Sequence, residues 1–236
     1  MKFLPITGVF LFLLLPAQSL SQAPGSGHSG HDSTIVFGSM DKPANAQSQQ
    51  QTFNNSMGAN LMISPSGFGL GTYYRHEYTD NFSAFIDLSI SEAKDDNEED
   101  YVDQFGNTYT PGKINRFLVL PLFVGIQQRL FSDDIVDNFR PYVTAAAGPA
   151  MIYVFPYNEE YFSALGHGSP KYTAGGYIGF GAFFGSERSN VLGLNLRYYY
   201  IPYPGGITSL QQPDGTIINK SDFGSVTIGL TFGGAW

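Results

Sequence analysis

The connections between predicted strands alternate in length along the chain, and this alternation constrains the fold more than any other feature. From Ser56 to the C-terminus the pattern predicts eight strands. Short links follow every second strand, at residues 79–81, 132–138 and 186–190. The other connections, at 64–67, 93–112, 156–170 and 204–221, include three long loops. Short turns at one end and long loops at the other are typical of up-and-down barrels in an outer membrane.

Pairing across the turns predicts which side chains share a face, because partners on adjacent strands point to the same side of a sheet. A three-residue turn pairs Tyr78 with Phe82, and a four-residue loop pairs Ile63 with Phe68. One face of the first three strands is then mostly apolar. Its predicted members are Leu61, Ile63, Phe68, Leu70, Thr72, Tyr74, His76, Tyr78, Ile86, Leu88 and Ile90.

Among the later strands, some alternate clearly between apolar and polar residues and two do not. Leu194 and Ile228 lie on clearly alternating strands and are predicted to face lipid. Strands four and five are apolar on both faces over much of their length, so the pattern leaves their faces unassigned. Pro121 and Pro149 each remove a ladder hydrogen bond, so we expect them at bulges.

Composition favours a barrel in lipid over a secreted β-sandwich. Aromatic residues make up 15%, charged residues 14%, and the chain has 28 glycines. The non-apolar faces carry Gly, Ser, Thr and Asn rather than the Lys and Glu of a solvated sandwich surface. A net charge of -8 argues against a nucleic-acid partner. The absence of Cys excludes disulfides and a lipoprotein anchor.

Three segments are expected along the chain. Residues 1–21 read as a signal peptide, because Lys2 precedes an apolar run of about ten residues that is too short to span a bilayer as a helix. Residues 22–55 are polar and aperiodic and are predicted to be a flexible arm. His28 and His31 in this arm lack further ligands and make weak evidence for a metal site. Residues 56–236 form the predicted barrel.

Four charged residues fall on the predicted inner face. They are Arg75, Glu77, Asp87 and Arg197, two positive and two negative. The interior of an eight-stranded barrel is just wide enough to be filled by side chains, and charges inside it must be paired. We therefore predict a buried charge network that plugs the barrel. The alternative is a polar path for small solutes.

Two loop segments carry residues that could support chemistry. The segment from Glu92 to Asp103 contains seven acidic residues, counting both ends. Their spacing matches no EF-hand, and a solvated, self-repelling loop is favoured over a Ca²⁺ or Mg²⁺ site. His167 and Ser169 have the His-x-Ser spacing of outer-membrane lipid A deacylases, with Glu159 nearby. They lie in Gly-rich sequence beside a proline rather than on a rigid strand. We therefore predict no catalytic, cofactor-binding or metal-binding residues.

The barrel sequence, roughly from Ser56 to Trp236, resembles a known family. The matching motifs are Leu120-Pro121-Leu122, Pro141-Tyr142, Gly148-Pro149 and Leu194-Asn195-Leu196-Arg197-Tyr198. They are similar to those of the outer-membrane β-barrel domain family, sometimes labelled PorT-like. The resemblance implies a barrel of the outer-membrane protein X or A type and no activity. Such chains usually stop at the last strand's aromatic residue, whereas here Gly233 to Trp236 follow Phe232. Either Phe232 or Trp236 is expected to serve as the assembly signal.

Together these observations predict an all-β, eight-stranded antiparallel transmembrane barrel in the bacterial outer membrane. We expect a structural or cell-surface role, with the long loops as contact surfaces and no enzymatic activity or cofactor. The expected partners are outer-membrane lipid, lipopolysaccharide and the barrel assembly machinery, and the protein is expected to be a monomer. The alternatives are a narrow channel for small solutes and a lipid A-modifying enzyme.

Overall fold

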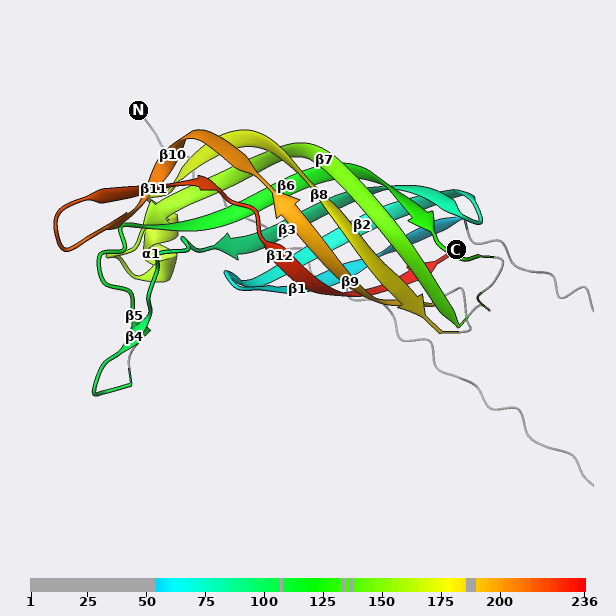
Figure 1. The fold of residues 1–236 in the computed structure, drawn as a ribbon, viewed down its shortest axis with the longest axis horizontal. Coiled ribbons are helices and arrows are strands. Elements are labelled where there is room, and N and C mark those ends of the chain that lie inside the picture. Colours follow the sequence, from blue (N-terminus) through cyan, green and yellow to red (C-terminus); the bar gives the residue numbers. More distant parts are fainter. Residues whose placement is uncertain (1–53, 107, 133–134, 136–137, 186–189) are drawn as a thin grey trace, which may run out of the picture. The chain divides into compact units, whose positions relative to one another are not determined.

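The computed structural model describes residues 54–106, 108–132, 135, 138–185 and 190–236, and these form a closed antiparallel barrel (Figure 1). The barrel strands are β1 (Asn55–Ser64), β2 (Gly67–Thr79), β3 (Phe82–Ala93), β6 (Asn115–Arg129), β7 (Phe139–Pro156), β8 (Ser169–Phe184), β9 (Asn190–Tyr200) and β12 (Val226–Ala235). Each of these strands pairs with the barrel strands that precede and follow it in the chain, and β1 pairs with β12 to close the barrel. The predicted eight-stranded up-and-down barrel is confirmed.

The two ends of the barrel differ as predicted. The turn end holds the short links, and there the Asn55 N–H donates to the Trp236 carbonyl oxygen at 3.1 Å. The loop end holds the other connections, and these contain further elements that the sequence pattern did not identify (Figure 1). They are β4 (Tyr101–Val102), β5 (Thr108–Tyr109), α1 (Tyr161–Leu165), β10 (Pro202–Gln211) and β11 (Ile217–Asp222).

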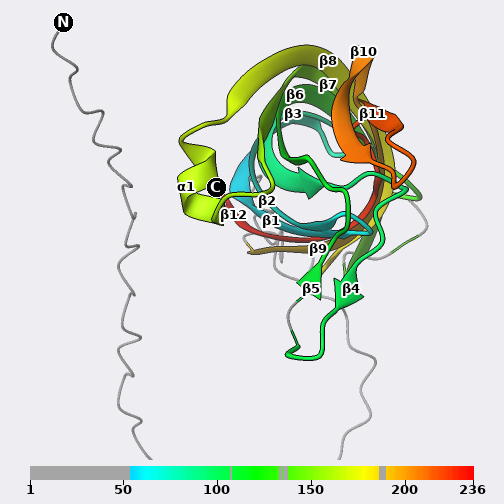
Figure 2. The ribbon, with the colours of Figure 1, turned by 90° about the vertical axis from the view of Figure 1, so that its left-hand side faces the viewer.

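The β10–β11 hairpin lies beside the rim at the loop end (Figure 2). Its Ser209 carbonyl oxygen accepts a hydrogen bond from the Ile114 N–H at 2.9 Å, and its Thr208 carbonyl oxygen accepts one from the Asn115 side chain at 2.9 Å. Ile207 and Leu210 of the hairpin are buried. The hairpin is therefore attached to the barrel by backbone hydrogen bonds and by apolar packing.

Most of the predicted register is confirmed. Leu70 pairs with Ile90 and Ile63 pairs with Phe68, as the turn lengths require. The predicted pairing of Tyr78 with Phe82 is wrong, because Thr79 pairs with Phe82 and the register shifts between Glu77 and Thr79. The Phe82 N–H donates to the Thr79 hydroxyl oxygen at 3.0 Å, which closes a tighter turn. The extra residue is accommodated as an irregularity in β2.

The prediction of bulges at the two prolines is also wrong. The β6–β7 register is the same on both sides of Pro149, and the β3–β6 register is the same on both sides of Pro121. Pairing is only interrupted, opposite Pro121 in β3 and opposite Pro149 in β6. Pro121 still pairs with Ala150 of β7, and Pro149 still pairs with Ala174 of β8. A missing N–H on one side of a strand thus breaks one ladder locally without an inserted residue.

The outward face of the barrel is apolar. Leu194 is 46% exposed and Ile228 is 54% exposed, and their face assignment is confirmed. The structure also assigns β6 and β7. Val124 and Ile126 point outward on β6 and Val143 does so on β7, whereas Phe123 and Ile152 point inward.

Two apolar clusters fill parts of the barrel interior. The loop-end cluster extends from the middle of the barrel to the loop end, and its large members include Phe117, Phe123, Ile152, Tyr177, Tyr199, Ile201, Ile207 and Phe223. The turn-end cluster consists of Tyr73, Tyr142, Phe183 and Val191. Strands β6 and β7 are therefore apolar on both faces because one face points out and the other packs inside the barrel.

No helix among the described residues is long and apolar enough to cross a membrane. The predicted signal peptide, most of the predicted arm, and His28 and His31 lie outside the described residues.

Candidate functional site: the barrel interior

The four predicted interior charges form two separate ion pairs. Arg197 Nη1 lies 2.8 Å from Asp87 Oδ2, and both side chains are buried. Arg75 Nη2 lies 3.6 Å from Glu77 Oε1, and the Glu77 side chain is 41% exposed. The register explains the separation, because it places Asp87 opposite Tyr73 and Arg75 opposite Phe85.

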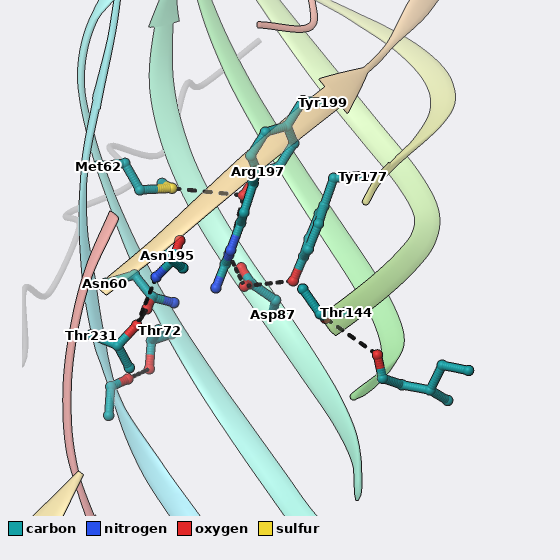
Figure 3. Close-up of polar contacts among 12 residues, drawn as sticks. Asn60, Met62, Thr72, Asp87, Thr144, Tyr177, Asn195, Arg197, Tyr199 and Thr231 are labelled. Carbon is teal, nitrogen blue, oxygen red and sulfur yellow. Dashed lines mark hydrogen bonds and ion pairs between the residues drawn. The ribbon is translucent and has the colours of Figure 1, made fainter. Parts of the chain in front are cut away.

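The Arg197–Asp87 pair crosses the barrel. In the closed strand order β9 and β3 are four strands apart in either direction, so the two residues come from opposite walls. Tyr177 and Tyr199 surround the pair (Figure 3). The Tyr177 hydroxyl lies 3.5 Å from Asp87 Oδ2, and Arg197 Nη1 donates to the Tyr199 hydroxyl at 3.2 Å. The Arg197 guanidinium carbon also lies 4.8 Å from the centre of the Tyr177 ring, at cation–π distance.

A second polar group lies beside this pair and joins three strands (Figure 3). The Thr231 hydroxyl donates to Asn60 Oδ1 at 2.7 Å, and Asn195 Nδ2 donates to the Thr231 hydroxyl oxygen at 3.0 Å. All three residues are buried. They cross-link β1, β12 and β9 next to the seam where the barrel closes.

Small cavities lie in the interior of the described barrel. A cavity of about 60 Å³ lies at the turn end. A cavity of about 20 Å³ lies between Arg75 and the Arg197–Asp87 pair, and another of about 20 Å³ lies toward the loop end near Ile201 and Phe223. A cavity of about 20 Å³ has room for one or two water molecules. The sequence pattern missed the loop-end cluster, because Phe117, Phe123 and Ile152 come from the two strands whose faces could not be assigned, and Ile207 comes from a connection predicted to be a loop.

The acidic segment at the loop end is held by ion pairs and hydrogen bonds. Lys113 pairs with Glu98, and Lys94 Nζ lies 2.9 Å from Asp100 Oδ2. The Thr110 hydroxyl donates to Asp100 Oδ1 at 2.6 Å. The hydrogen bond from Thr110 is the largest cause of a lowered pKa at Asp100, and the hydrogen bond from Lys94 is the next. The hydrogen bond between Lys94 and Asp100 also raises the pKa of Lys94. Two bases therefore offset part of the repulsion expected in this loop.

The His-x-Ser segment lies on the surface. His167 Nδ1 is 2.7 Å from Glu159 Oε2, and the two side chains are 64% and 36% exposed. Ser169 opens β8 and is exposed. Within the described residues, no hydrogen bond links its hydroxyl to His167. Among all the residues that the structure describes, no group of three or more His, Cys, Asp or Glu residues is placed to hold a metal ion.

No protein-family model and no curated protein matches the sequence. Several solved structures are similar at low identity. Neisserial surface protein A is 13% identical, with a TM-score of 0.44, over 75% of this chain and 94% of that one. The N-terminal β-barrel domain of Pseudomonas aeruginosa OprF is 14% identical, with a TM-score of 0.41, over 76% and 97%. Escherichia coli outer membrane protein W is 13% identical, with a TM-score of 0.39, over 79% and 100%. The assignment of an eight-stranded barrel rests on the strand pairing of this chain itself.

Proposed function

We propose that the protein is an integral outer-membrane barrel with a structural or cell-surface role, and that it neither conducts solutes nor catalyses a reaction. The observation that carries this proposal is a closed barrel whose outward face is apolar and whose interior is filled. The proposed partners are outer-membrane lipid and lipopolysaccharide, with the barrel assembly machinery during biogenesis, and the protein is proposed to be a monomer.

The outward face supports membrane insertion. Large apolar side chains such as Leu70, Ile86, Val124, Ile178 and Ile228 are between 48% and 65% exposed on strands all around the barrel. Each would cost on the order of 1–2 kcal/mol to hold in water rather than in an apolar surrounding. Soluble monomers rarely expose so large a continuous apolar area. A bilayer removes this cost, and the closed barrel leaves no unpaired strand edge in lipid.

The filled interior supports a role other than transport. From the turn end inward, a solute would meet the turn-end cluster, then the Arg197–Asp87 pair, then the loop-end cluster. Phe117, Phe123, Ile152 and Ile201 of the loop-end cluster are at most 2% exposed. A hydrated ion would have to displace these side chains and lose much of its own hydration.

Cell fractionation tests the location. We expect the mature protein in the outer-membrane fraction, migrating faster on gels before boiling than after, because a folded barrel resists detergent unfolding. Recovery in the soluble periplasmic fraction would contradict the proposed location.

Planar-bilayer recording tests the closed interior. We expect no steady conductance from the purified protein, whereas a stable conducting state would favour the channel alternative. A change in lipid A mass on expression, lost in His167→Ala, would favour the enzyme alternative.

A further inference from the structure

We propose that the turn end of the barrel interior contains a binding site for a small oxyanion, a phosphate or carboxylate group, centred on Arg75. This site goes beyond the proposed structural role, and neither claim depends on the other.

Arg75 is a buried cation with a donor that lacks a hydrogen-bond partner. The residue is 5% exposed, and its Nε makes no hydrogen bond. Its contact with Glu77 is 3.6 Å long, which is an ion pair but too long for a hydrogen bond. Its other contacts are with ring faces, 4.6 Å from the Phe183 ring centre and 5.9 Å from that of Tyr73. A guanidinium has five N–H donors, and burying them without acceptors is costly.

A cavity of suitable size adjoins this guanidinium. Arg75 lines the turn-end cavity of about 60 Å³ together with Ser83, Gln127 and Tyr142. One water-sized sphere needs roughly 10–15 Å³, so the cavity accommodates about four to six non-hydrogen atoms. A phosphate group has five such atoms and a carboxylate has three, so both groups fit.

Three of the five charged side chains that line this cavity are cationic. Arg129 and Arg140 line the same cavity as Arg75, and the acids that line it are Glu77 and Asp80. Both acids are at the solvent-exposed rim, whereas Arg75 is buried. Arg129 and Arg140 have contacts of their own, so the assignment rests on Arg75.

The orientation of Arg75 is fixed before a ligand arrives. Its guanidinium lies over the Phe183 ring, which stacks on the Tyr142 ring with centroids 4.6 Å apart and planes at 23°. A planar guanidinium held in this way offers two parallel donors, which match the oxygens of a carboxylate or phosphate. Such preorganisation lowers the entropy lost on binding.

The test is titration of the purified full-length mature protein, folded in a zwitterionic detergent, with inorganic phosphate and with acetate. Chloride at matched ionic strength is the reference. Binding is followed by calorimetry and by the ¹⁵N resonance of arginine Nε–H groups. We expect saturable binding of at least one of the two anions, with a shifted Arg75 Nε–H resonance. The affinity should fall at least tenfold in Arg75→Gln. It should fall by a smaller factor in Arg75→Lys, which keeps the positive charge but not the two parallel N–H donors of the guanidinium.

Lys171→Gln is the matched control, because Lys171 is an exposed cation near the loop end. It should bind the anion like the wild type. If Arg75→Gln does not fold, Arg75→Lys alone carries the comparison. Absence of any response beyond chloride, or an unchanged affinity in Arg75→Lys together with an unmoved Arg75 resonance, would overturn the proposal.

A further titration distinguishes the source of the group. Glycerol phosphate that binds as well as inorganic phosphate indicates the end of a larger molecule entering from the turn end. Binding of inorganic phosphate alone indicates a free ion.

Discussion

Arg197 and Asp87 come from strands on opposite walls of the barrel, and their side chains meet at 2.8 Å inside it. They are 110 residues apart in the chain. This contact crosses the interior at the point where the loop-end cluster begins, and it links the strands of one wall to those of the other.

Removing Arg197 should destabilise the barrel by roughly 3–5 kcal/mol, because Asp87 is then a buried charge without its partner. Urea unfolding of Arg197→Ala in lipid vesicles measures this change. The double variant Arg197→Ala with Asp87→Asn should recover part of the loss, since the cost comes from the orphaned carboxylate. An Arg197→Ala protein as stable as the wild type would mean that water solvates Asp87.

Replacing Ile228 by Arg should cost about 2–4 kcal/mol if this residue lies near the bilayer midplane. Ile228→Leu, which keeps the apolar surface, should be nearly neutral. The chain has no Cys, so a single Cys at position 228 can carry a fluorophore. We expect strong quenching of this label by brominated lipid. Thr227 is 5% exposed on the inner face, and a label there should be difficult to attach.

The loop end should face the outside of the cell, because the short turns and the C-terminus lie at the other end. A Cys in place of Asp214, in the turn between β10 and β11, should react with a membrane-impermeant maleimide on intact cells. A Cys in place of Asp80, in the turn between β2 and β3, should react only after the outer membrane is opened. The reverse pattern would invert the topology.

Acid should loosen the loop that carries β4 and β5. The pKa of Asp100 is lowered, first by the Thr110 hydroxyl and then by Lys94, so the ionised carboxylate stabilises the folded loop. This contribution is present above the ordinary Asp pKa of 3.8 and is lost as the pH falls through the lower folded value. The pKa of Lys94 is raised from 10.5, so its contribution is lost only as the pH rises above that value.

Amide exchange at Thr110 measures this effect. It should stay slow at neutral pH and quicken, relative to its intrinsic rate, in acid. In Asp100→Asn the acid transition should disappear, and a transition that persists there would assign it to another carboxyl group.

Local periodicity was sufficient to predict the strand number, the up-and-down order and the outward face of most strands. Hairpin pairing depends only on turn length and on the two-residue period of a strand, and Leu70 opposite Ile90 follows from these alone. The same arithmetic failed at Tyr78, where a hydrogen bond from the Phe82 N–H to the Thr79 hydroxyl oxygen closes a tighter turn. The bulge predicted at Pro121 from its missing N–H is also absent, because the ladder tolerates one missing bond without an inserted residue.

Closure of the barrel determines which side chains meet in its interior. The sequence alone determined that Arg75, Glu77, Asp87 and Arg197 share the inner face, because that follows from alternation along each strand. Which of them meet depends on the width and stagger of the closed barrel, and no single hairpin sets these. The loop-end cluster likewise brings Phe117 against Phe223, with ring centroids 5.1 Å apart, from segments far apart in the chain. Periodicity reports which side a residue faces, whereas only closure of all eight strands determines what it faces across the interior.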